Sequence, residues 1–155
     1  MRKVKREISN FADILDLLRN LDTLRLGISD QPYPYVVPVS FGFEVRDGLL
    51  RFYFHGAKEG KKAELLAENP RVCAEADRCY RFKNTDRAVT CLYESVIAFG
   101  TCRILTGYEA RHGLEQILKH CGYSDLEIDP AVLPATAIWE ITVESVTGKC
   151  RDKHN

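Results

Sequence analysis

Segment 52–62 carries the side chains best placed to do chemistry. It runs from an apolar stretch through a glycine-containing loop into a helical pattern, and its lysines are Lys58, Lys61 and Lys62. The unpaired N–H groups and partial positive charge of a helix N-terminus attract anions. Lysines in the first turn oppose that dipole and cost stability unless a negative group binds there. The pattern indicates a phosphate site; the alternative is a solvated lysine cluster balanced by Glu59 and Glu64.

The same segment differs from the P-loop that binds nucleoside triphosphates. That loop needs four residues between its glycines and a Ser or Thr after its lysine. Here three residues separate Gly56 from Gly60, and Lys62 follows Lys61. Hydrolysis of a nucleoside triphosphate is therefore not expected.

His55 ends the apolar stretch and is the candidate catalytic residue. Its imidazole could act as a general acid, a phosphate donor or a proton relay; the alternative is a structural hydrogen-bonding role. His112 and His120 lack the i, i+4 spacing of a helical metal site. The six cysteines form no Cys-x-x-Cys pair, so no zinc site is predicted and the cysteines are expected to be thiols.

A proline interrupts the apolar run from Tyr35 to Ser40. Proline cannot donate to a strand ladder, so Pro38 indicates a free sheet edge or a bulge. A free edge beside apolar side chains could hydrogen-bond a flat ring with a polar rim. The alternative is an ordinary edge strand that accommodates the proline.

Hydrophobic periodicity predicts the elements that position these residues. A helix capped by Ser9 or Asn10 begins at Phe11. An antiparallel meander follows over 24–54, in which 35–45 is one strand. The remaining elements are helices over 58–69 and 109–121 and strands over 72–76, 90–105 and 137–146. Gly100 indicates a bulge or a close backbone approach, and Trp139 is expected in the core or at an interface rather than in catalysis. The fold class is α+β, mainly β, built around an antiparallel barrel or sheet.

Composition places the chain among ordinary globular proteins. It has 155 residues, 45% of them hydrophobic, and its 22 basic and 22 acidic residues give a net charge of zero. Neutrality argues against nucleic acid or an anionic membrane as partner. The basic N-terminus is followed by no apolar signal segment, so a cytoplasmic location is expected. We expect one domain over residues 1–155.

The order of several short motifs resembles a known family. The motifs are Val37–Gly42, Phe52–Lys62, Asn69–Val72, Tyr93–Gly100 and Val143–Lys149. Together they resemble the pyridoxamine-5'-phosphate-oxidase-like family of FMN-binding split β-barrels, and within it the 5-nitroimidazole-resistance subgroup. The resemblance covers the chain from about Arg6 to Lys149.

The resemblance implies a homodimer with two FMN sites at the subunit interface. The residues that it assigns to FMN are Val37, Pro38, Val39, Ser40, Phe54, His55, Gly60, Lys61, Lys62 and Ser95. Of these, the strand Val37 to Ser40 would present its backbone to the isoalloxazine ring, and Lys61 and Lys62 would bind the phosphate. His55 matches a histidine implicated in activity in the nitroimidazole-resistance relatives.

Departures from the oxidase proper narrow the expected activity. Tyr35 and Ser40 stand where the oxidase has Arg and Lys, and the chain ends in 150–155 without the oxidase's Trp and Arg segment. Oxidation of pyridoxamine phosphate is therefore doubtful. The expected function is an FMN-dependent oxidoreductase that reduces a small acceptor, such as a nitroaromatic, with electrons from a nicotinamide donor. The alternatives are a non-catalytic flavin-binding or sensing protein and a structural domain that has lost its flavin.

Overall fold

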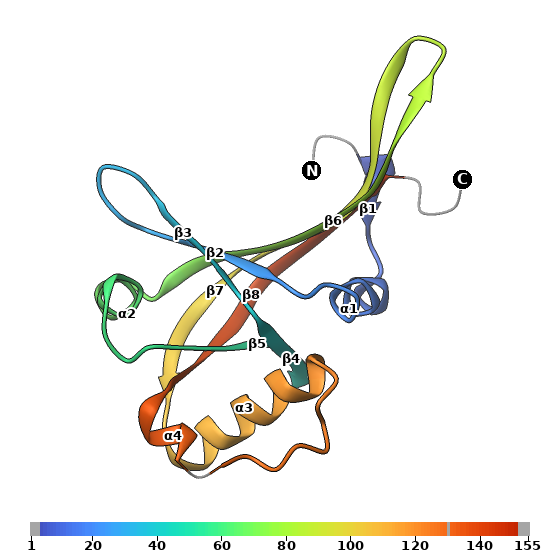
Figure 1. The fold of residues 1–155 in the computed structure, drawn as a ribbon. Coiled ribbons are helices and arrows are strands. Elements are labelled where there is room, and N and C mark those ends of the chain that lie inside the picture. Colours follow the sequence, from blue (N-terminus) through green and yellow to red (C-terminus); the bar gives the residue numbers. More distant parts are fainter. Residues whose placement is uncertain (1–3, 130, 152–155) are drawn as a thin grey trace.

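One antiparallel sheet organises the chain (Figure 1). The computed structural model describes residues 4–129 and 131–151. The elements are a 3-10 helix Val4–Arg6, β1 Glu7–Ile8, α1 Phe11–Leu18, β2 Leu24–Ile28, β3 Tyr35–Val39, β4 Phe41–Arg46, β5 Leu49–Gly56, α2 Lys61–Glu68, β6 Arg71–Thr85, β7 Ala88–Leu105, α3 Gly107–His120, α4 Val132–Ala135 and β8 Ala137–Arg151. The predicted α+β, mainly β, split-barrel class is confirmed.

The sheet order is β3-β2-β6-β7-β8-β5-β4, and the short β1 pairs with the far end of β8. Strands β3 and β4 are thus the two edges, and the curved sheet encloses the main apolar core between them. Helix α3 packs against the other face of β4 and β5, where Tyr53, Leu114, Ile117 and Ile138 form a second apolar cluster. Among the described residues, no helix is long and apolar enough to cross a bilayer.

The prediction of one strand over 35–45 is wrong. Ser40 separates β3 from β4, and the two strands pair with different neighbours, β2 and β5. Val39 and Phe41 are buried, whereas Val45 is 43% exposed. A continuous apolar pattern is equally compatible with one strand or with two strands that meet at a bend. The chain therefore passes from one sheet edge to the other at Ser40 without a hydrogen-bonded ladder between the edges.

Other local expectations are confirmed. Asn10 caps α1, since its side chain accepts a hydrogen bond from the Ala12 N–H at 3.0 Å. The β7–β8 register shifts at Gly100, where a Cβ atom would overlap the Thr142 carbonyl group. Strand β6 extends well beyond the predicted 72–76, whereas β7 begins only two residues before the predicted 90–105 and ends at the same residue. The joined ends of β6 and β7 project from the barrel as a hairpin (Figure 1).

A buried carboxylate joins three strands beside α3. Glu140 on β8 is 1% exposed. Its oxygens accept hydrogen bonds from Arg51 at 2.8 Å, Arg103 at 3.0 Å and Arg46 at 3.2 Å, and the Tyr53 hydroxyl lies 3.2 Å away. Burial alone would raise the pKa of Glu140, but the hydrogen bond and charge of Arg103, with the charge of Arg51, outweigh it and lower the pKa.

Replacing this carboxylate is expected to destabilise the fold. Glu140→Gln should lower the free energy of unfolding by about 3 kcal/mol, because three arginines lose their shared counter-ion. Urea denaturation at neutral pH measures the loss. Because the folded-state pKa of Glu140 is lowered, the wild type should lose the contribution of Glu140 as the pH falls below about 4.

The matched control for that substitution is Glu144→Gln on the same strand. Glu144 is exposed and accepts a hydrogen bond from Thr101 at 2.6 Å. Its loss should change the unfolding free energy by less than about 0.5 kcal/mol. Equal destabilisation by the two substitutions would contradict a special role for the buried carboxylate.

Candidate functional site

The loop between β5 and α2 forms the expected anion-binding element. Strand β5 ends at Gly56, and α2 begins at Lys61 after the N-cap residue Gly60. Gly60 has φ +102°, a conformation that favours glycine, and it offers no side chain to cap the helix. The first N–H groups of α2 therefore lack a side-chain acceptor. An anion placed there would satisfy them and interact favourably with the helix dipole.

The two lysines of the first helical turn differ in their surroundings. Lys61 is exposed, and its ammonium lies 2.6 Å from an Asp30 oxygen, which raises the pKa of Lys61 through a hydrogen bond. Lys62 is half-buried, and its ammonium lies over the Phe54 ring at 5.2 Å from the centroid. Desolvation by this burial lowers the pKa of Lys62. No described carboxylate forms an ion pair with Lys62, so Lys62 is the lysine left to receive an anion.

Three residues outside the predicted site shape this position. Gly56 leaves the space that Lys62 occupies, since a Cβ atom there would overlap the lysine ammonium. Trp139 stacks on Phe54 with centroids 6.2 Å apart and an interplanar angle of 6°. The third is Asp30, which neutralises Lys61. The glycine was visible in the sequence motif, whereas no sequence signal linked Asp30 or Trp139 to the loop, because both are brought there by tertiary structure.

The predicted free edge lies on β3. Pro38 faces Arg25 of β2, and no described strand pairs with the opposite side of β3. Pro38 and Ser40 are exposed, Val37 is half-buried and Val39 is buried. The backbone between Val37 and Ser40 therefore offers hydrogen-bonding groups at an accessible edge.

His55 and Phe54 occupy opposite faces at the end of β5. His55 is exposed and stands opposite Ile138 in the ladder. Phe54 is fully buried in the main core and reaches the candidate site only as the ring beneath Lys62. His55 has no hydrogen-bond partner among the described residues, so its imidazole is available to a bound molecule.

Ser95 lies apart from these residues within one chain. It is on β7 opposite Asp77 and Lys149, and it shares the outer face of the sheet with Ile97 and Phe99. Cys102 of the same strand is buried on the inner face and is close enough to Lys62 to interact with its charge. Cys102 is seven positions further along the strand than Ser95, which is about 23 Å of extended chain. A single chain therefore does not bring Ser95 to the lysine loop.

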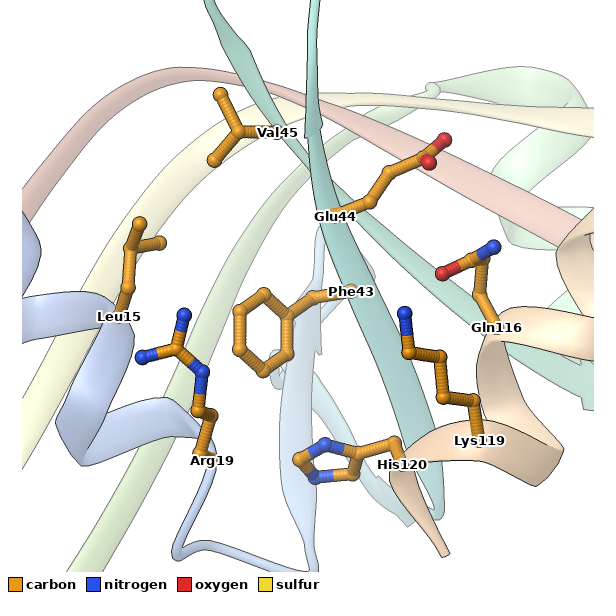
Figure 2. A pocket seen from close by; sticks show the side chains of 8 residues that line it. All are labelled: Leu15, Arg19, Phe43, Glu44, Val45, Gln116, Lys119 and His120. Atoms are coloured by element: carbon orange, nitrogen blue, oxygen red, sulfur yellow. The ribbon is translucent and has the colours of Figure 1, made fainter. Parts of the chain in front are cut away.

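A separate pocket of about 520 Å³ lies between α1, β4 and α3 (Figure 2). The Phe43 side chain points into it from β4, with Arg19, Lys119 and His120 around it. Several of its polar groups are engaged within the protein: His120 contacts the Leu21 carbonyl oxygen at 2.8 Å, and Arg19 pairs with Asp16. None of the sequence-predicted site residues lines this pocket.

Metal ligation has no support in the described part of the chain. No group of three or more His, Cys, Asp or Glu side chains there is arranged to hold a metal ion. The chemistry available at the loop is that of a lysine ammonium, helix N–H groups, an edge-strand backbone and one imidazole.

The fold is a mainly antiparallel split barrel, and the N-terminus of α2, which bears Lys61 and Lys62, lies beside the open edge of β3. These two features define the class of barrel protein to which the chain is compared. Residues 11–150 match the family model described as pyridoxamine 5'-phosphate oxidase. The chain belongs to this family. The resemblance inferred from the motifs is thus confirmed.

Solved structures agree with this assignment. A candidate 5-nitroimidazole antibiotic resistance protein from Bacteroides thetaiotaomicron is 27% identical, with a TM-score of 0.81 over 92% of this chain and 85% of that one. The flavocytochrome Anf3 from Azotobacter vinelandii is 18% identical, with a TM-score of 0.78 over 98% and 72% of the two chains.

A FAD and heme binding protein from Mycobacterium smegmatis is 17% identical, with a TM-score of 0.79 over 95% of this chain and 74% of that one. The structures from Azotobacter vinelandii and Mycobacterium smegmatis share the fold of this chain. A comparison with curated proteins finds no match.

Proposed function

We propose that this protein binds FMN and uses it to pass electrons from a nicotinamide donor to a small acceptor such as a nitroaromatic. The observation that carries the proposal is the half-buried ammonium of Lys62, which has no carboxylate partner among the described residues and stands in the first turn of α2. Burying a cation without a counter-ion is unfavourable, so an anionic group is needed there. The terminal phosphate of FMN supplies two such charges in a compact form.

Family membership and the named neighbours support a flavin as the molecule that carries the phosphate. Two structures with this fold are named for a flavocytochrome and for FAD binding. The similarity to a candidate 5-nitroimidazole resistance protein supports a nitroaromatic acceptor.

Each residue group has a distinct role in this proposal. Lys62 and the N–H groups of α2 bind the phosphate, and the backbone of Val37 to Ser40 hydrogen-bonds the polar rim of the ring. Pro38 contributes only its carbonyl group, since it has no N–H. Bound FMN supplies the redox chemistry. His55 donates a proton to the acceptor as the acceptor is reduced.

The site is completed by a second copy of the chain. Phe99 is 54% exposed and Val36 58% exposed on the outer face of the sheet, and Gly27 and Cys73 lie between them in register. An apolar row on this face favours burial against a partner. Ser95 lies on the same face and cannot reach the lysine loop of its own chain. Pairing of two copies through this face would bring Ser95 of one to the FMN held by the other.

The phosphate assignment predicts a difference between two flavins. Lys62→Met should weaken FMN binding about 10- to 100-fold, because a charge-assisted hydrogen bond to phosphate is lost. Riboflavin lacks the phosphate, so its affinity should change less than about twofold. Flavin fluorescence titration of the purified apoprotein measures both affinities.

Lys61→Met is the matched control, since Asp30 already engages the Lys61 ammonium. It should weaken FMN binding less than Lys62→Met does. An FMN-specific loss as large for Lys61 as for Lys62 would contradict the distinction between them, and unchanged FMN binding in both variants would refute the phosphate site.

A substitution of His55 distinguishes a role of this residue in turnover from a role in flavin binding. His55→Asn should keep FMN affinity within about twofold and lower the rate of NADPH oxidation with a nitroaromatic acceptor about 100-fold, because the proton donor is lost. Steady-state kinetics over a pH range gives the rates. Loss of flavin retention in this variant would instead make His55 a ligand-positioning group. A flavin-loaded wild type without acceptor-dependent NADPH or NADH oxidation would indicate a non-catalytic flavin-binding protein.

A substitution at Phe99, on the apolar outer face formed with Val36, tests the proposed homodimer. Phe99→Asp should convert the protein to monomers and weaken FMN binding, because a buried carboxylate would oppose pairing of the two sheet faces. Sedimentation velocity measures the oligomeric state. Tyr108→Asp is the control on α3, where the side chain is 84% exposed and away from this face. A wild type that sediments as a monomer would refute the pairing.

A further inference from the structure

Two cysteines meet at the base of the projecting hairpin. The Sγ atoms of Cys79 on β6 and Cys91 on β7 are 2.9 Å apart. In the ladder Cys79 faces Tyr93 and Cys91 faces Phe82, so the cysteines are diagonal neighbours across the two strands. Diagonal neighbours in a regular antiparallel ladder are about 7 Å apart, so their sulfur atoms would at best reach van der Waals contact, and a closer approach needs a local distortion of the ladder.

A bulge explains the closer approach. The register shifts between Cys79 and Arg81, which leaves Tyr80 without a ladder partner. Bulges increase the local twist and redirect neighbouring side chains. The contact between the two thiols is therefore a consequence of the backbone path.

The two thiols are accessible and chemically unequal. Cys79 is exposed and Cys91 is half-buried. The hydrogen bond with Cys79, followed by desolvation, raises the pKa of Cys91, while the charge of Arg151 acts in the opposite direction. Cys79 is thus the more accessible of the two thiols and the one that meets an oxidant from solvent first, and Cys91 lies in contact with it as the second thiol.

The hairpin beyond the pair consists of two strands without further cover. Every residue from 80 to 89 is exposed, and Thr85 and Ala88 close the turn through hydrogen bonds of 2.7 and 3.1 Å. A two-stranded ladder alone is marginally stable, so a covalent link at its base would restrain it.

We propose that Cys79 and Cys91 form a reversible dithiol–disulfide site that is oxidised by a hydroperoxide. The Cys79 thiolate attacks the terminal peroxide oxygen, the S–O bond forms, the O–O bond breaks, and Cys79 becomes a sulfenic acid. The departing oxygen takes up the proton that the Cys79 thiol had released, so an alcohol or water leaves. The Cys91 sulfur then attacks the Cys79 sulfur, the S–O bond breaks, and water leaves with the Cys91 proton. In sum, two thiols and one hydroperoxide give a disulfide, one alcohol or water, and one water. A dithiol reductant reverses the oxidation.

Thiol mapping of the full-length protein tests this site without reference to the proposed flavin. The fully reduced protein is treated with one equivalent of hydrogen peroxide, and the remaining thiols are alkylated and mapped by mass spectrometry. The expected product is an intramolecular Cys79–Cys91 cross-link that loses two alkylation sites and regains both with dithiothreitol. Cys91→Ser should leave Cys79 as a sulfenic acid that dimedone traps, and Cys79→Ser should abolish the cross-link.

Cys121→Ser is the matched control, since Cys121 is exposed at the end of α3. This variant should form the Cys79–Cys91 cross-link as the wild type does. Full alkylation of both Cys79 and Cys91 after peroxide would overturn the proposal. So would a disulfide that links two chains, or oxidation of Cys79 beyond sulfenic acid while Cys91 remains a free thiol.

Discussion

The buried Glu140 carboxylate is the interaction on which the arrangement of this barrel depends. A carboxylate that is 1% exposed must be met by cations, and the sequence supplies them from three strands, with Arg46 on β4, Arg51 on β5 and Arg103 on β7. These ion pairs fix the β4–β5 hairpin against the centre of the sheet. They do so on the side covered by α3, which leaves the end of β5 and the start of α2 free to form a site.

The buried charges of Glu140 and Lys62 differ in how they are compensated. Glu140 is fully compensated and serves the fold. Lys62 is half-buried over Phe54, and no described acid compensates it. The neighbouring pair of Lys61 and Asp30 shows that the same loop can neutralise a lysine internally. The uncompensated cation therefore marks the position at which an anion would gain most by binding. Phe54, on which Trp139 stacks, lies beneath the ammonium, and Gly56 leaves space for it.

Local chemistry predicted much of the fold and of the candidate site. The glycine loop followed by lysines, the proline at a sheet edge and the capped first helix all depend on near neighbours in sequence. What escaped prediction depends on long-range pairing. The break at Ser40 follows from which strand each edge selects, and the neutralisation of Lys61 by Asp30 requires the β2–β3 loop to fold onto α2. A hydrophobic pattern carries neither kind of information.

The position of β8 has a consequence for how the chain is made. Residues 137–151 are the last strand of the described chain, yet they occupy the middle of the sheet and pair with β7, β5 and β1. A ribosome-bound chain that ends before Ala137 can form the β2–β3, β6–β7 and β4–β5 ladders, but the β4–β5 hairpin has no strand to join in the sheet. Assembly of the barrel must therefore wait until β8 has left the exit tunnel. Until then the partly made sheet presents unpaired edges on which the nascent chain is open to chaperones.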